Sequence, residues 1–149
     1  MGLSERDIFG DKVNSKTLKG KILVINFWFV GCAPCVQEIP ELNKLVKDYE
    51  RDSSIVFIAI ALDKPWDIKD FLKKRPFYYK IIGDGRLTAK GYDVRAYPTN
   101  LVVSPEGKIY FHTAGYSGYS TIHWIKKSIE ELKELRTTDG SAESNTQEN

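Results

Sequence analysis

The 149-residue chain has few of the residues that usually bind metals, since it contains only two histidines and two cysteines. A structural zinc site needs four ligands, typically two Cys pairs or a Cys pair with a spaced His pair. His112 and His123 lie far from the cysteines in sequence, and there is no second Cys pair. A c-type haem site needs His directly after a Cys-x-x-Cys motif, and residue 36 is Val. These shortages argue against a metal site, and we expect no cofactor.

The sequence also lacks an excess of one charge and a long apolar run. Its 22 basic and 20 acidic residues give a net charge of +2, without a basic block, which argues against a nucleic-acid partner. No apolar run reaches the length of about 20 residues that a transmembrane helix needs. Residues 1–7 lack the apolar core of a signal peptide. We therefore expect no signal peptide here, and any membrane tether would lie outside this chain.

Length and composition predict one globular domain followed by a tail. A chain of this length with 42% hydrophobic residues can build a single packed core. Residues 137–149 contain no apolar residue larger than Ala, so they cannot bury enough surface to offset the entropy lost on ordering. We predict a packed domain over residues 1–136 and a disordered polar tail over 137–149.

Hydrophobic periodicity predicts that strands and helices alternate along the domain. Continuous apolar runs at 21–29 and 55–62 are typical of strands buried on both faces of a sheet, and an amphipathic helix is expected over 33–51. This order predicts a layered α/β fold with helices on both faces. The other expected elements are a hairpin over 8–13, a helix over 66–74, an extended segment over 77–82, a helix over 87–92, paired strands over 100–104 and 109–113, and a last helix capped by Ser120.

The two cysteines, Cys32 and Cys35, lie three residues apart directly after the first buried run. A disulfide that closes so short a loop adds little stability through chain entropy, which favours redox chemistry over a structural role. Cys32 is expected at the N-terminus of the following helix, where free N–H groups and the helix dipole favour a thiolate. The thiolate is the attacking species in disulfide exchange. We therefore predict that Cys32 is the nucleophile and that Cys35, one turn further on, resolves the mixed disulfide.

Several motifs resemble the thioredoxin superfamily: the run 26–28 (Asn-Phe-Trp), the Cys-x-Pro-Cys motif at 32–35 and Glu-Ile-Pro at 38–40. The segments at 18–21, 97–99 and 101–109 are similar to the TlpA/ResA-like branch of extracytoplasmic thiol–disulfide oxidoreductases. This resemblance covers about residues 7–134. It implies a thioredoxin-like three-layer α/β/α fold with a central mixed sheet and an N-terminal hairpin. It also implies a periplasmic or membrane-anchored bacterial location.

The resemblance further implies a set of residues that contact the substrate. Pro98 matches the family's cis-proline, which would face both cysteines, and the backbone of Tyr97 would pair with an incoming substrate strand. Ala33 and Pro34, between the cysteines, would belong to the same surface. Gly31 departs from the pattern, because this position usually carries Trp.

The resemblance places Glu38 near the active-site thiols. Asn26 occupies a position where thioredoxins proper carry a buried Asp, and an amide cannot shuttle a proton. Glu38 would then be the nearby carboxylate for proton transfer, and the alternative is an ordinary surface Glu on the helix.

These observations together predict an enzyme, a thiol–disulfide oxidoreductase that acts as a monomer on protein thiols and disulfides and has a redox partner protein. One alternative is a peroxiredoxin-like thiol peroxidase, but such enzymes carry Thr three residues before the reactive Cys, where this chain has Phe29. The other alternative is a redox-inert binding module that uses the groove near Pro98.

Overall fold

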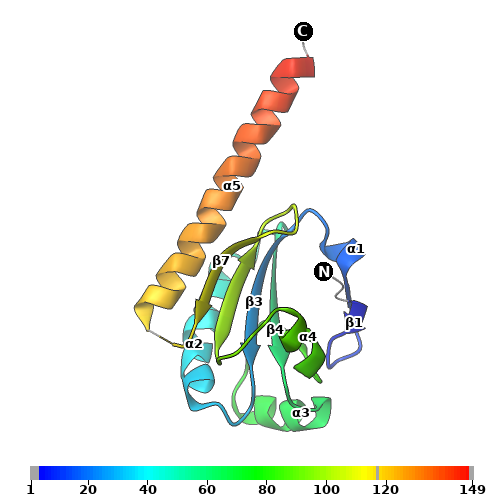
Figure 1. Ribbon diagram of the computed structural model, residues 1–149, viewed down its shortest axis with the longest axis vertical. Coiled ribbons are helices and arrows are strands. Elements are labelled where there is room, and N and C mark those ends of the chain that lie inside the picture. The colour runs from blue at the N-terminus through cyan, green and yellow to red at the C-terminus, as the bar shows by residue number, and fades with distance from the viewer. Residues whose placement is uncertain (1–3, 117, 148–149) are drawn as a thin grey trace.

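The computed structural model describes residues 4–116 and 118–147, and a five-stranded mixed sheet forms its centre (Figure 1). The order of the strands across the sheet is β5-β4-β3-β6-β7. The central strand β3 pairs in parallel with β4 and antiparallel with β6. The strand bounds are β3 (Ile22–Trp28), β4 (Ile55–Ala61), β5 (Lys80–Ile82), β6 (Thr99–Val103) and β7 (Ile109–Ala114).

The two longest apolar runs form the centre of the sheet, as predicted. Every residue of β3 is buried, and so is every residue of β4 except Val56. A strand with neighbours on both edges and helices on both faces has no wet side, which explains its continuous apolar sequence. Asn26 is the one polar residue of β3, and it lies directly opposite Asn100 of β6 in the antiparallel ladder.

Two apolar clusters fill the two faces of the sheet, which gives the predicted three layers (Figure 1). One face is covered by α2 (Ala33–Asp48), α3 (Pro65–Lys74) and α5 (Tyr119–Gln147). The other face is covered by α1 (Ser15–Leu18) and α4 (Arg86–Gly91). Among the described residues, no helix combines the length and the apolar character needed to cross a bilayer.

The N-terminal hairpin is present, but it is longer than the expected range of 8–13: its first strand lies before that range, and its second strand begins within it. It pairs β1 (Ser4–Arg6) with β2 (Lys12–Asn14) as a separate two-stranded sheet, and residues between them form the turn. Asp7 fixes this turn, because one carboxylate oxygen accepts hydrogen bonds from the backbone N–H groups of Phe9 and Asp11.

The last helix also differs from the expectation at both ends. It begins at Tyr119, so Ser120 lies in its first turn and is not the N-cap. It continues to Gln147 through residues for which the composition predicts disorder. Helical hydrogen bonds are local and need no buried surface, and the segment contains no proline that would interrupt them. The division of the chain into a packed domain and a tail at residue 136 stays a prediction.

Candidate functional site

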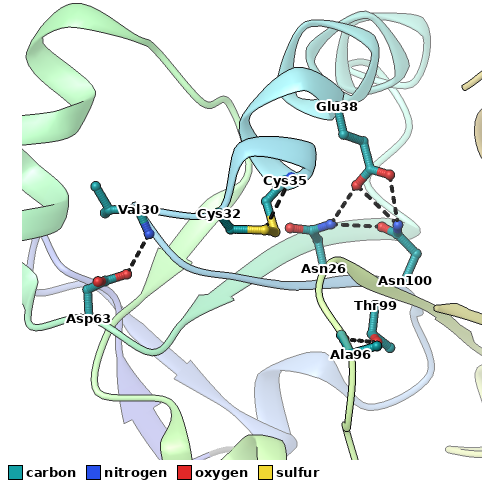
Figure 2. Close-up of a disulfide and its surroundings, with 9 residues drawn as sticks. All are labelled: Asn26, Val30, Cys32, Cys35, Glu38, Asp63, Ala96, Thr99 and Asn100. Carbon is teal, nitrogen blue, oxygen red and sulfur yellow. Dashed lines mark hydrogen bonds between the residues drawn. A yellow bond between two sulfur atoms is a disulfide. The ribbon is translucent and has the colours of Figure 1, made fainter. Parts of the chain in front are cut away.

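The two cysteines lie where β3 passes into α2, and they form a disulfide with a Cα–Cα distance of 5.2 Å (Figure 2). Cys32 is the N-cap of α2, as predicted. Its Sγ accepts the backbone N–H of Cys35 at 3.3 Å, and its carbonyl accepts the N–H of Val36 at 3.0 Å. The sulfur thus takes the place of the side-chain oxygen that usually caps a helix. This position favours negative charge on Cys32 once the disulfide is reduced.

Exposure alone does not distinguish the two cysteines, since Cys32 is 5% and Cys35 is 2% exposed. The difference between them lies in the helix, because Cys32 precedes the first turn and Cys35 lies within it. Ala33 and Pro34 are exposed and form the first two positions of α2. They present an exposed surface beside the disulfide.

Glu38 is completely buried, with no exposed surface, and it does not point into solvent. Its Oε1 accepts the side-chain N–H of Asn26 at 2.9 Å. The side-chain amide of Asn100 donates to Oε1 at 3.1 Å and to Oε2 at 3.2 Å. Asn26 also donates to the Asn100 carbonyl oxygen at 2.9 Å, which closes a three-residue network. This network joins α2 to the neighbouring strands β3 and β6.

The environment of Glu38 raises the pKa of its carboxyl from 4.5 to about 7. Burial is the largest cause, because it penalises the charged form. The hydrogen bonds from Asn100 and Asn26 favour the carboxylate and offset part of this effect. A group with such a pKa can gain or lose a proton near neutral pH.

The Asn26 side chain lies between the disulfide and Glu38 (Figure 2). Its nitrogen faces Glu38, and its carbonyl oxygen points toward the sulfurs. An amide oxygen can accept a hydrogen bond from a thiol. The amide of Asn26 therefore places polar atoms between the buried carboxyl and the cysteines.

The Tyr97–Pro98 peptide bond is cis, and Pro98 is buried at the start of β6. Thr99 pairs with Phe27 in the antiparallel ladder, so the residues before Thr99 lie beside the end of β3 from which the cysteines follow. The half-buried ring of Tyr97 packs edge-on against Phe29, with the ring centroids 5.5 Å apart. The Pro98 carbonyl accepts the N–H of Gly115 at 2.7 Å. The fold thus places Tyr97 and Pro98 at the same end of the sheet as the cysteines.

Gly31 is exposed and borders a hollow of about 440 Å³ between the cysteine loop and α3. A Cβ atom at this position would meet only the Phe29 ring, at 3.9 Å. The hollow is lined on the α3 side by Phe71 and by charged side chains that include Asp67 and Lys74. The absence of the usual Trp therefore leaves open space beside the cysteines.

Sequence reasoning missed two residues of this region. Asn100 carries no local signal, because its partner Glu38 is 62 residues away in the chain. Asp63 accepts the backbone N–H of Val30 at 2.8 Å and so holds the loop that leads to Cys32 (Figure 2). A signal for Asp63 was present: it follows a buried strand parallel to β3, and the carboxyl ends of parallel strands meet at one edge of a sheet.

Comparisons with known proteins agree with this geometry. ResA, a thiol-disulfide oxidoreductase of Bacillus cereus, is 31% identical over 105 residues, which are 69% of this chain and 60% of that protein. The alignment thus spans less than two thirds of the length of this relative. A solved thiol-disulfide oxidoreductase from Bacteroides fragilis superposes with a TM-score of 0.73 at 25% identity, over 85% of this chain and 96% of that chain.

The fold of StoA from Bacillus subtilis is also similar, with a TM-score of 0.71 at 21% identity, over 87% of this chain and 96% of that chain. These likenesses show the thioredoxin-like fold that the sequence predicts. Residues 3–112 match the model of the AhpC/TSA family, which is most of the chain. The chain, with its oxidised Cys32–Cys35 pair at the start of α2, therefore belongs to the AhpC/TSA family.

Proposed function

We propose that the protein is a thiol–disulfide oxidoreductase that exchanges disulfides with protein substrates through Cys32 and Cys35. The observation that carries this proposal is the position of the pair: both cysteines of the chain meet at the N-terminus of the helix after the central strand. The disulfide closes too short a loop to serve as a staple. The resemblance to ResA supports the same chemistry.

In the reducing direction, the Cys32 thiolate attacks one sulfur of a substrate disulfide. A bond forms between Cys32 and that sulfur, and the other substrate sulfur leaves as a thiolate. Cys35 then loses its proton and attacks the Cys32 sulfur, which closes the Cys32–Cys35 disulfide and releases the second substrate thiolate. The two cysteines are oxidised and the substrate gains two electrons, and the oxidising direction reverses each step.

Glu38 is the proposed proton acceptor for Cys35 during resolution. Its buried carboxyl, with a pKa of about 7, is partly ionised at neutral pH and can take the thiol proton. Asn26 has no titratable group and does not relay the proton: its N–H orients the Glu38 carboxylate, and the proton passes to that carboxylate itself. When the reaction runs in reverse, protonated Glu38 returns the proton to Cys35.

The proposed substrate surface combines Ala33 and Pro34 with Tyr97 and Pro98. Ala33 and Pro34 are exposed beside the sulfurs, and the start of β6 lies at the same end of the sheet. An extended substrate segment could pair with the backbone of Tyr97 and bring its disulfide to Cys32. A redox partner protein would use the same surface to restore the starting state of the cysteines.

We also propose an extracytoplasmic location, periplasmic or membrane-anchored, with any tether outside this chain, and a monomeric state. The resemblance to the TlpA/ResA-like branch supports the location, because disulfide exchange serves proteins in oxidising compartments. Protease treatment of spheroplasts from the native host should degrade the protein while the cell membrane is intact. Light scattering of the purified chain should give the mass of one copy, 17.0 kDa.

The function is tested by variants of the two cysteines. Cys32→Ser should abolish the reduction of insulin disulfides, because no thiolate remains at the helix N-terminus. Cys35→Ser should instead accumulate a mixed disulfide through Cys32, because no second thiol resolves it. Mass spectrometry of the trapped species identifies the cysteine.

The same preparations distinguish the alternatives. Rapid turnover of peroxide without insulin reduction would indicate a thiol peroxidase. No turnover of either compound, with both cysteines reduced and accessible to a labelling reagent, would indicate a redox-inert binding module. Trapping through Cys35 would reverse the assigned roles.

A further inference from the structure

We propose that Asn100 is a positioning residue for disulfide exchange: its side-chain amide holds the Glu38 carboxylate from β6 and keeps it available to accept the proton of Cys35. This inference rests on the proposed function and adds a residue that none of the sequence motifs contains. Asn100 is completely buried, so it cannot contact a substrate.

The geometry gives Asn100 the larger share in holding Glu38. Its amide nitrogen lies 3.1 Å from Oε1 and 3.2 Å from Oε2, so it spans both oxygens of the carboxylate. Asn26 reaches only Oε1. The Asn100 carbonyl oxygen also accepts the second N–H of Asn26, which fixes the orientation of that amide. Because the nitrogen of Asn26 is held in this way, its oxygen is left facing the sulfurs (Figure 2).

The charges around the carboxyl explain why this contact matters for proton transfer. Burial favours the neutral acid, and the amide N–H donors favour the carboxylate. Among the described residues, the other titratable groups that face this site are the two cysteines and Tyr79, which precedes β5. Burial, with a contribution from Glu38, raises the pKa of Tyr79 well above its usual value, so this phenol stays neutral. The amides are therefore the groups that keep Glu38 partly ionised near neutral pH.

The direct test measures the titration of the Glu38 carboxyl by ¹³C NMR in the oxidised protein. Asn100→Leu keeps the side chain's approximate size and removes its donors, so the midpoint should rise by about one pH unit or more. Asn100→Thr restores one hydroxyl donor in a strand-compatible side chain and should give an intermediate midpoint. Asn43→Leu is the matched control. It makes the same change of side chain on α2, the helix that carries Glu38, but Asn43 bonds to residues 76 and 78 and not to Glu38. This control should leave the Glu38 midpoint unchanged.

The functional test uses Ellman's reagent, whose second thiolate is released when Cys35 resolves the mixed disulfide at Cys32. The rate of this second phase at neutral pH should fall about fivefold in Asn100→Leu, because a midpoint raised by one unit leaves about a fifth as much carboxylate. The loss should disappear at higher pH. In a Glu38→Gln background, Asn100→Leu should have no further effect on the pH profile.

The outcomes separate this inference from the function on which it rests. If Glu38→Gln removes the pH dependence but Asn100→Leu moves neither the NMR midpoint nor the rate profile, Asn100 is only a core residue and the inference is wrong. If Glu38→Gln itself leaves the profile unchanged, the proton-transfer role of Glu38 fails, whatever the NMR midpoint shows. If Asn100→Leu does not fold, the midpoint in Asn100→Thr decides: an unchanged value overturns the inference.

Discussion

At the scale of single residues, the site keeps a carboxyl buried against three amide hydrogen bonds. A buried carboxylate is costly unless hydrogen bonds satisfy its oxygens, and a partly satisfied network costs more than an apolar core. Here both oxygens of Glu38 have donors, and both donors are uncharged. Amides offset burial only in part, whereas a cation would have lowered the pKa much further. Neutral donors thus leave the pKa of Glu38 near neutral pH, as the proposed proton acceptor needs.

Gly31 offers a test of substrate binding at the same scale. Gly31→Trp should place an indole in the open hollow toward Phe71 and add an apolar surface beside the sulfurs. If a substrate covers about 40 Å² of that surface, the gain is about 1 kcal/mol, which corresponds to a roughly fivefold lower KM for a protein disulfide. Steady-state kinetics with insulin measure this.

The control for Gly31→Trp is the pKa of the Cys32 thiol, read from the pH dependence of iodoacetamide labelling. It should stay within about one unit of the wild-type value, because no hydrogen bond to the sulfur changes. A larger displacement would mean that residue 31 tunes the chemistry of the thiol and not the contact area.

At the scale of elements, the loop between β3 and α2 is held by the segment that follows β4. Asp63 accepts the Val30 N–H, and its own carbonyl accepts the N–H of Asp84 at 2.8 Å. Asp63 therefore connects the cysteine loop to Asp84, which lies just before α4. Such a link holds the loop that leads to the N-terminus of α2.

Asp63→Ala should lower the free energy of unfolding by about 1–2 kcal/mol, because the half-buried Val30 N–H loses its acceptor. Urea denaturation of the oxidised protein measures the change. Asp70→Ala is the matched control: this side chain is 83% exposed in a 3.8 Å pair with Lys73, and such pairs contribute little. Equal losses in the two variants would show that the loop does not depend on Asp63.

The elements also show what a sequence can and cannot predict. The strands β3 and β4 and the start of α2 follow from local signals, namely continuous apolar runs and a Cys-x-Pro-Cys motif before an amphipathic pattern. The network around Glu38 does not follow from local signals. Helical spacing predicts that Glu38 and Cys35 share one face of α2, but it does not identify the strand residue that contacts Glu38. The start of α5 at Tyr119 was also missed, because Ser120 is a common N-cap residue and its place in the first turn has no separate sequence signal.

At the scale of the whole molecule, the mixed sheet brings the reactive groups to one end. β4 runs parallel to β3, so Asp63 follows it at the end where the cysteines follow β3. β6 runs antiparallel, so its first residues, after Pro98, lie at that same end. The polar residues Asn26 and Asn100 lie opposite each other just inside this end. The topology thus places the proposed substrate surface at this end of the sheet and the buried carboxyl of Glu38 further inside.

The protonation of Glu38 should make the stability of the whole molecule depend on pH. Its carboxyl has a pKa of about 7 in the folded protein against 4.5 ordinarily, so the folded state binds more protons between these values. The stabilisation from protonation is complete below about pH 4.5 and is lost as the pH rises through about 7. A difference of this size corresponds to about 3 kcal/mol of unfolding free energy.

Glu38→Gln should remove this component, because an amide of similar shape does not titrate. Urea denaturation of the oxidised proteins from about pH 4.5 to about pH 8 should show that the wild type loses stability relative to Glu38→Gln, by about 3 kcal/mol across the window. Glu50→Gln removes the same charge from an exposed position after α2 and should keep the wild-type slope. If the wild type and Glu38→Gln change in parallel, the buried carboxyl does not take up a proton in this range. Such a result would leave Cys35 without the proposed acceptor, even though the network around Glu38 still joins α2 to the sheet.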